Sequence, residues 1–225
     1  MTGLAATRRS LVKTLALGLG FSLLAIALLI GAWTLWILLL RPVPDGFAPT
    51  SGQAFGVAGQ ARNIVQFTAD ARSRREWVYF SFAKGAVAAT SQEALDWDLA
   101  FRRTDVLTNS GDTNPQGGAG AVDLGKVTLE EAAAPVDGFL QDVTHEDRGL
   151  ENPAMHSWYN YDWTSHIITS KGHTYALRAG SEDVVLLTFV SYYCDDGSPG
   201  CITFLYRKIE DPGPQTTSGW LQRAF

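Results

Sequence analysis

The chain has 225 residues, with 18 lysines and arginines against 23 aspartates and glutamates, and its formal net charge is -5. The first 41 residues carry four basic side chains and no acidic one, so the rest of the chain carries a net charge of -9. An acidic main body excludes the phosphate backbone of nucleic acid as the principal partner, because such a surface displaces few counterions.

Residues 14–40 form a run of 27 residues without a charge. As a helix this run would be about 40 Å long, which exceeds the roughly 30 Å of bilayer hydrocarbon. A secretory signal peptide normally has an apolar region of about 7–15 residues and a small-residue cleavage site. Here Arg41, Pro42 and Pro44 follow the run instead. The sequence therefore predicts one permanent transmembrane helix, with the lipid bilayer as a partner.

The charges beside this helix predict its orientation. Arg8, Arg9 and Lys13 precede the run, whereas Arg41 alone follows it. Basic residues beside a membrane helix are retained on the cytoplasmic side. We therefore expect the helix to span a bacterial plasma (inner) membrane, with residues 1–13 in the cytoplasm and the main body in the periplasm. A lipoprotein anchor would need a cysteine directly after the run, but the two cysteines stand at positions 194 and 201.

Small residues follow one face of the predicted helix. Ala16, Gly20, Ala27 and Gly31 are separated by four, seven and four positions. Such a face lets a neighbouring helix approach closely, as in an assembly with other integral membrane subunits. Small residues are also common in membrane helices that act only as anchors, so both interpretations stay open.

The main body divides into a linker, a domain and a tail. Residues 41–59 are rich in proline and glycine and predict a linker. Residues 60–210 are long enough for one domain with its own core. Residues 211–225 form a C-terminal tail of the kind that normally frays.

The sequence pattern of the domain predicts an all-β fold. Strands are expected at 76–82, 97–102, 183–193 and 201–209, and a hairpin is expected from 158–168 and 174–178 with its turn at Lys171 and Gly172. Residues 127–134 are compatible with a short helix before Pro135, and residues 109–120 have turn chemistry. Short strands between frequent turns predict an antiparallel β-sandwich-like fold. Cys194 and Cys201 enclose a six-residue loop outside the cytoplasm, which predicts a disulfide.

Several segments resemble a known family when they are taken in order. They are DARSRREWVYFSF at 70–82, DWDLAFRR at 96–103, TNSG at 108–111, the glycine pair at 117–118, WYNY at 158–161 and YYC at 192–194. Together they resemble HmuY-like proteins over roughly residues 60–210. The resemblance implies an all-β domain that binds haem outside the cell through paired axial ligands.

The sequence departs from that family in two respects. Haem-capturing members are usually lipid-anchored or released, whereas this chain carries an apolar helix. The axial ligands of the family also have no matching positions here. From the residues alone, the candidate haem ligands are Met155, His156 and His166. With the expected turn, His166 and His173 would lie about 13 Å apart along the strand and project in parallel, which is poor axial geometry.

Other groups of residues give weaker evidence for a functional site. Asp96 and Asp98 are expected to form ion pairs with Arg102 and Arg103 rather than to perform acid–base catalysis. Exposed aromatic residues are enriched at protein interfaces, although they also build β cores. The interface candidates are Trp158, Tyr159, Tyr161, Trp163, Trp220 and Phe225.

The sequence thus favours a non-catalytic, single-pass accessory subunit of a plasma-membrane complex, for example a respiratory or photosynthetic assembly, without a cofactor of its own. The alternative is a membrane-tethered periplasmic haem-binding protein. No catalytic motif and no metal-binding motif is recognisable in the sequence, so an enzyme is not expected.

Overall fold

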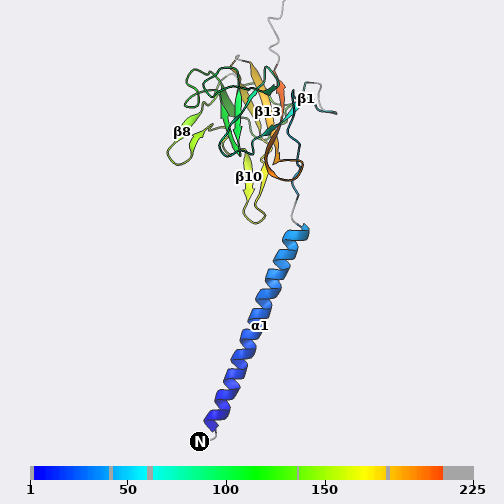
Figure 1. Cartoon of the computed structure of the whole chain (residues 1–225), viewed down its shortest axis with the longest axis vertical. Coiled ribbons are helices and arrows are strands. Elements are labelled where there is room, and N and C mark those ends of the chain that lie inside the picture. The colour runs from blue at the N-terminus through cyan, green and yellow to red at the C-terminus, as the bar shows by residue number, and fades with distance from the viewer. Residues whose placement is uncertain (1–2, 41–42, 60–62, 136, 181–182, 210–225) are drawn as a thin grey trace, which may run out of the picture. The chain divides into compact units, whose positions relative to one another are not determined.

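The computed structural model describes residues 3–40, 43–59, 63–135, 137–180 and 183–209 (Figure 1). The chain forms two units, one containing the single helix and the other containing the sheets. The elements, in chain order, are α1 (Gly3–Leu40), β1 (Phe55–Gly56), β2 (Val65–Asp70), β3 (Val78–Ser81), β4 (Ala86–Val87), β5 (Leu99–Arg102), β6 (Asp105–Thr108), β7 (Gly120–Asp123), β8 (Val143–His145), β9 (Gly149–Glu151), β10 (Tyr159–Asp162), β11 (Ile167–Ser170), β12 (Thr174–Arg178), β13 (Val184–Tyr193) and β14 (Pro199–Lys208).

Helix α1 is longer than the apolar run suggested. It begins at Gly3 rather than at residue 14, because the preceding leucine, alanines and arginines are good helix formers. Its segment Gly18–Trp36 has a mean hydropathy of 2.0 and is long and apolar enough to cross a bilayer. A signal sequence near an N-terminus meets the same criteria of length and composition. A Cβ at Gly20 or Gly31 would meet no atom within 4 Å, so helix packing stays a prediction.

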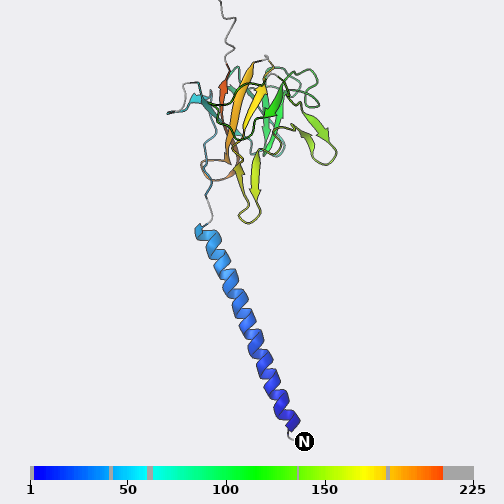
Figure 2. The same cartoon turned by 180° about the vertical axis from the view of Figure 1, so that it is seen from behind.

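Two antiparallel sheets build the domain, as the all-β prediction required. The larger has the strand order β1-β2-β14-β13-β12-β7, and the smaller has the order β4-β3-β5-β6. The long strands β13 and β14 pair antiparallel along most of their length, as expected for the two apolar segments near the C-terminus. Two further hairpins, β8–β9 and β10–β11, extend from these sheets (Figures 1 and 2).

Aromatic side chains fill the space between the two sheets. Phe80 of β3 and Phe101 of β5 lie 5.2 and 5.4 Å, between ring centroids, from Phe204 of β14. Phe67 of β2 lies 4.5 Å from Phe80 in the same way. All four rings are fully buried. Burial of side chains this large dominates the hydrophobic stabilisation of a sandwich core.

The expected linker is mostly part of the domain. Gly46 forms a parallel bridge with Tyr193, and Phe47 N donates to the Tyr193 carbonyl at 3.0 Å. Further along, Thr50 N donates to Thr68 O at 2.9 Å, and Phe55 pairs with Gln66 as β1 joins β2. Proline and glycine suit an extended segment that lies along a sheet, and the sequence pattern does not distinguish this from a free linker.

The predicted hairpin between 158–168 and 174–178 is wrong. Residues 163–166 form the turn, so β10 pairs with β11, and Tyr159 lies opposite Ser170. Lys171 and Gly172 connect β11 to β12, which pairs instead with β7 and β13. The turn was missed because it contains no glycine, proline or asparagine. His166 takes the left-handed conformation there, with φ of 56°.

The suggested short helix at 127–134 is also wrong. The segment makes one turn, closed by a bond of 2.9 Å from Ala132 N to Thr128 O. The Thr128 hydroxyl caps this turn by contacting the Glu131 carboxylate and backbone N–H. Pro135 prevents continuation into a helix, because it lacks a backbone donor. By contrast, the disulfide between Cys194 and Cys201 is present and links the ends of β13 and β14.

Candidate functional site

A cleft of about 510 Å³ lies among β6, β9 and β10. Its lining combines one imidazole, two phenols, one aliphatic hydroxyl, a guanidinium, two carboxylates and two aliphatic side chains. The residues are Asp105, Val106, Arg148, Leu150, Glu151, His156, Ser157, Tyr159 and Tyr161. Pockets of this size, with apolar walls and a few polar groups, are typical of sites for small molecules and cofactors.

Trp158 fixes the beginning of the wall that β10 contributes. Its indole is fully buried, 4.7 Å from the ring of Phe189, and its Nε1 donates to Thr104 O at 3.0 Å. The β11 side of the hairpin is held on β13, since Ser170 Oγ donates to Phe189 O at 2.6 Å and Ile168 N donates to the Tyr193 hydroxyl at 2.9 Å. Tyr159 and Tyr161, two positions apart on β10, therefore share the face that lines the cleft.

A buried carboxylate supports the cleft from behind. Asp142 accepts hydrogen bonds from Thr108 N, Thr113 Oγ1 and Asn152 Nδ2 at 2.9, 2.7 and 2.9 Å. Burial raises the pKa of Asp142, although the hydrogen bonds from Thr108, Asn152 and Thr113 oppose this rise. The network joins the end of β6 to the segments before β8 and after β9, and so sets the relation between two walls of the cleft.

His156 presents a nitrogen lone pair. Its Nδ1 lies 3.1 Å from Pro153 O, and because a carbonyl only accepts, this nitrogen must carry the proton. In the neutral tautomer with this proton the lone pair is on Nε2, which is the arrangement found in histidines that ligate metals. His156 is exposed and lines the cleft. This candidate ligand is therefore compatible with the geometry.

Tyr161 and His166 form a pair beside the cleft. The Tyr161 hydroxyl lies 2.5 Å from His166 Nδ1. Tyr161 lines the cleft, whereas His166 stands in the turn that follows β10. The prediction named His166 and treated Tyr161 only as an interface residue. The link between them follows from the four-residue turn, which the sequence did not reveal.

The other candidate ligands are placed differently. Met155 is fully buried in the main core and is not among the residues that line the cleft, so we do not propose it as a ligand there. His173 contacts the Asp123 carboxylate at 2.9 Å on the β7–β12 edge, so the predicted parallel arrangement with His166 on one hairpin is also wrong. His145 Nε2 contacts Glu151 Oε1 at 3.1 Å, and Arg148 contacts the same oxygen at 3.1 Å.

The predicted interface aromatics divide into three groups. Trp158 belongs to the core and is not an interface residue, and Tyr159 is half-buried beside it. Tyr161 is 37 % exposed and Trp163 is 82 % exposed, both on the β10–β11 hairpin. Trp220 and Phe225 lie outside the described residues.

The carboxylates near Trp97 are structural. Asp98 is buried and accepts from Phe82 N at 2.7 Å and from Gly180 N at 3.3 Å, and burial raises its pKa. Asp96 contacts Lys84 at 2.7 Å instead of the predicted arginines. Arg102 contacts Asp105 at 3.3 Å. Among the described residues, no group of three or more His, Cys, Asp or Glu side chains is arranged to hold a metal ion.

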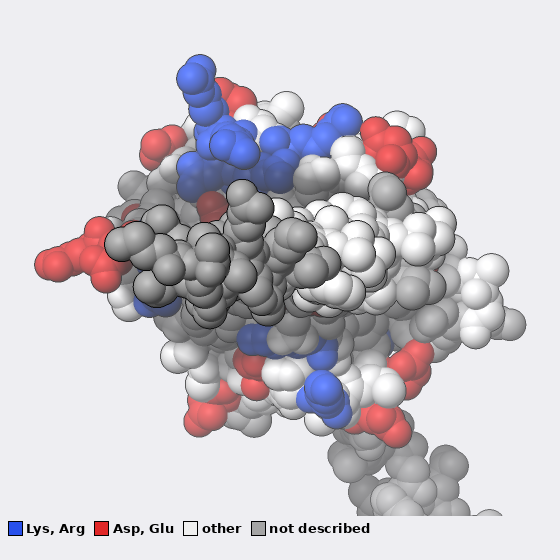
Figure 3. Space-filling model, turned by 90° about the horizontal axis from the view of Figure 1, so that it is seen from below, with Lys and Arg blue, Asp and Glu red and all other residues white. Residues whose placement is uncertain are grey.

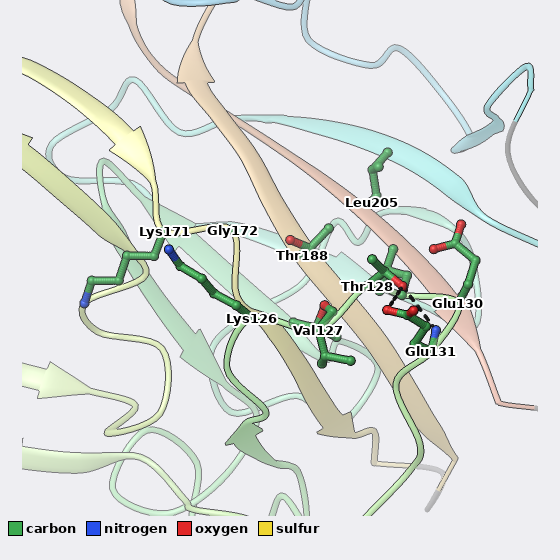
Figure 4. A pocket seen from close by; sticks show the side chains of 11 residues that line it. Lys126, Val127, Thr128, Glu130, Glu131, Lys171, Gly172, Thr188 and Leu205 are labelled. Carbon is green, nitrogen blue, oxygen red and sulfur yellow. Dashed lines mark hydrogen bonds between the residues drawn. The ribbon is translucent and has the colours of Figure 1, made fainter.

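A second hollow, of about 540 Å³, lies on the outer side of β13 and β14 (Figure 4). Lys126 and Lys171 stand at one side of it, and Glu130 and Glu131 stand at the other. The dashed bonds in Figure 4 join Glu131 to Thr128, so this carboxylate serves the local turn. The described residues that line this hollow include no histidine, tyrosine or methionine, the side chains that would be expected to ligate a haem iron.

The charged surface has no single sign. Figure 3 shows blue basic groups bordered by red acidic ones over the face in view. Two of the arginines have a carboxylate partner close by, since Arg72 pairs with Asp70 at 2.6 Å and Arg102 pairs with Asp105 at 3.3 Å.

The sequence of this domain matches the model of a known protein family. The family model for HmuY protein matches residues 73–206, which is more than half of the chain. A search of curated proteins finds no match.

Solved structures share the fold at low identity. A protein described as a lipoprotein from Bacteroides fragilis NCTC 9343 is 20% identical with a TM-score of 0.55, and the match covers 73% of this chain and 100% of the other. A protein described as an HmuY-like haem-binding protein from Bacteroides vulgatus ATCC 8482 is 17% identical with a TM-score of 0.52, over 66% and 94% of the two chains. The apo HmuY analog (TFO) of Tannerella forsythia is 15% identical with a TM-score of 0.54, over 65% and 95%.

Proposed function

The chain belongs to the HmuY family, and we propose that its β domain binds haem in the cleft among β6, β9 and β10. The observation that carries this proposal is His156, whose Nδ1 contact to Pro153 O leaves Nε2 as an acceptor in the same cleft. The solved relative from Bacteroides vulgatus is described as haem-binding, which supports the same reading.

The residues of the cleft fit haem in three respects. The His156 nitrogen suits an axial position on iron. Leu150, which is half-buried, provides aliphatic surface for the porphyrin, and Arg148, which also contacts Glu151, offers a cation for a propionate. Bound haem would supply an iron centre with open axial positions and a strong visible absorption band. The chain's own role is then to bind and orient this group, and we propose no catalytic step.

The N-terminal helix indicates the cellular compartment in which haem would bind. We propose that α1 tethers the domain to the plasma membrane, with the domain on the periplasmic side. The apolar segment Gly18–Trp36 supports the tether, and the basic residues that precede it support the orientation. The Cys194–Cys201 disulfide agrees with an oxidising compartment.

Titration of the full-length chain in mild detergent with ferric haem tests the binding proposal. We expect saturation at one haem per chain, with a shifted Soret band relative to free haem. His156→Ala should weaken binding by about tenfold or more, because it removes an iron ligand. His173→Ala is a matched control, since His173 contacts Asp123 on another edge. An unshifted Soret band with the folded wild-type chain would contradict the proposal.

A second function remains a candidate because Trp163 is 82 % exposed on a hairpin. Exposed tryptophan is typical of interfaces, and it suits an accessory subunit of a larger membrane complex. The expectation of a respiratory or photosynthetic assembly stays a prediction. Purification of the native complex through a tag tests it: stoichiometric membrane partners that are lost with Trp163→Ser would support it, and a lone chain would contradict it.

A further inference from the structure

We propose that Tyr161 is an iron ligand of the haem cleft and that His166 is the residue that positions its phenol. This inference rests on the proposed function and deepens it by assigning a ligand that differs in chemistry from His156. The observations that carry it are the shared cleft and the contact of 2.5 Å between the Tyr161 hydroxyl and His166 Nδ1.

The cleft contains both ligand types on separate elements. His156 stands in the turn before β10, whereas Tyr161 stands near the far end of β10. Tyrosine is an established axial ligand of haem iron, so a phenol in this cleft has the required chemistry. As a ligand, the Tyr161 phenol would lose its proton to solvent and would hold the iron through the resulting phenolate oxygen.

The backbone around His166 is built for this contact. His166 has φ of 56°, which is uncommon for a residue other than glycine. The conformation is held by a hydrogen bond of 2.8 Å from His166 N to Asp162 O, and β11 begins at the next residue. Backbone strain of this kind persists where the surrounding structure enforces it, often at functional sites. Here it brings the imidazole within hydrogen-bond distance of the phenol oxygen.

The neighbouring tyrosine provides an internal comparison. Tyr159 lines the same cleft from the same strand, but its ring packs at 5.4 Å against Trp158 and it is half-buried. No hydrogen bond from a histidine to Tyr159 is present among the described residues. The geometry therefore distinguishes one of the two phenols as a ligand.

Titration of the full-length chain in mild detergent with ferric haem tests this inference. The complex is followed by absorption, electron paramagnetic resonance and resonance Raman spectroscopy. The wild-type complex should show a phenolate-to-iron charge-transfer band. Tyr161→Phe should abolish this band and weaken binding about tenfold or more. Tyr159→Phe, the matched comparison from the same strand, should retain the charge-transfer band, because Tyr159 is not assigned as an iron ligand. His166→Ala should shift the band and weaken binding by about tenfold, since supporting residues of metal ligands have effects of that size.

The outcomes separate the two proposals. Haem binding by the wild type with spectra that Tyr161→Phe leaves unchanged would overturn this inference and leave haem binding intact. An absence of haem binding by the folded wild type would overturn both. A charge-transfer band that is lost with Tyr161→Phe and shifted with His166→Ala, while the folded content of both variants is unchanged in circular dichroism, would establish the assigned roles.

Discussion

The Asp142 carboxylate accepts a hydrogen bond of 2.9 Å from the side-chain amide of Asn152, and both residues are buried. Thr108 and Thr113 donate to the same carboxylate. The segments that contain Thr108, Thr113, Asp142 and Asn152 thereby meet at this one carboxylate, behind the cleft. Because a carboxylate has two oxygens that accept several bonds, a single residue can satisfy all of these donors.

Replacing Asp142 by alanine should destabilise the domain by about 3 kcal/mol, because several buried donors lose their acceptor together. Chemical unfolding of the full chain in mild detergent, followed by tryptophan fluorescence, measures this loss. Asp112→Ala is the control, since Asp112 accepts from Thr144 N at an exposed position, and it should cost about 1 kcal/mol or less. Equal losses in the two variants would contradict the role given to Asp142.

The acid range should show two opposite contributions to stability. Burial raises the pKa of Asp98 and Asp142 above 3.8. Between this value and the higher folded-state pKa, the folded protein holds protons that the unfolded chain has released. The free energy of unfolding therefore falls as the pH rises through this window, and it is constant above it with respect to these two groups.

Asp70 should behave in the opposite way. The hydrogen bond from Arg72 lowers the pKa of Asp70 below 3.8, so its contribution is present above that value and is lost as the pH falls through the lowered pKa. Carboxyl carbon resonances followed by NMR give all three midpoints. We expect values above 3.8 for Asp98 and Asp142 and below 3.8 for Asp70. A midpoint for Asp142 below 3.8 would mean that its hydrogen bonds outweigh its burial.

The sequence predicted the parts of the fold that local patterns determine. The aromatic segment around Phe80 and the apolar segment of β13 were recognisable as strands, and the spacing of Cys194 and Cys201 indicated their disulfide. The ordered motifs also indicated the family. The boundaries of the linker were wrong because proline and glycine suit both a free segment and one that lies against a sheet edge.

The candidate site was harder to predict because it depends on one turn. Lys171 and Gly172 have the composition of a hairpin turn, but they connect strands of different sheets, and the turn falls instead at 163–166. His166 therefore meets Tyr161 on its own hairpin and does not face His173. Met155 stands next to His156 in sequence but points into the core. Such placements follow from tertiary packing, which the sequence pattern does not contain.

Loss of the Cys194–Cys201 disulfide should have a modest effect. The bridge closes a short loop with a sequence separation of seven, so its effect on the entropy of the unfolded chain is limited to about 2 kcal/mol. The variant with both cysteines replaced by alanine, unfolded under oxidising conditions, should lose this amount. Reduction of the wild type should give the same loss, and reducing agent should leave the double variant unaffected. A wild type insensitive to reduction would contradict this expectation.

The glycine pair at 117–118 offers a sharper test of packing, because its two members have different surroundings. A Cβ on Gly117 would lie 2.0 Å from Asn109 O, whereas a Cβ on Gly118 would meet no atom within 4 Å. Gly117→Ala must displace backbone that Asn109 and Asn114 hold through their hydrogen bonds, so we expect a loss of about 2 kcal/mol or more. Gly118→Ala should change stability by about 0.5 kcal/mol or less. Thermal unfolding of both variants measures the difference, and equal melting temperatures would show that the loop relaxes around Gly117 at little cost.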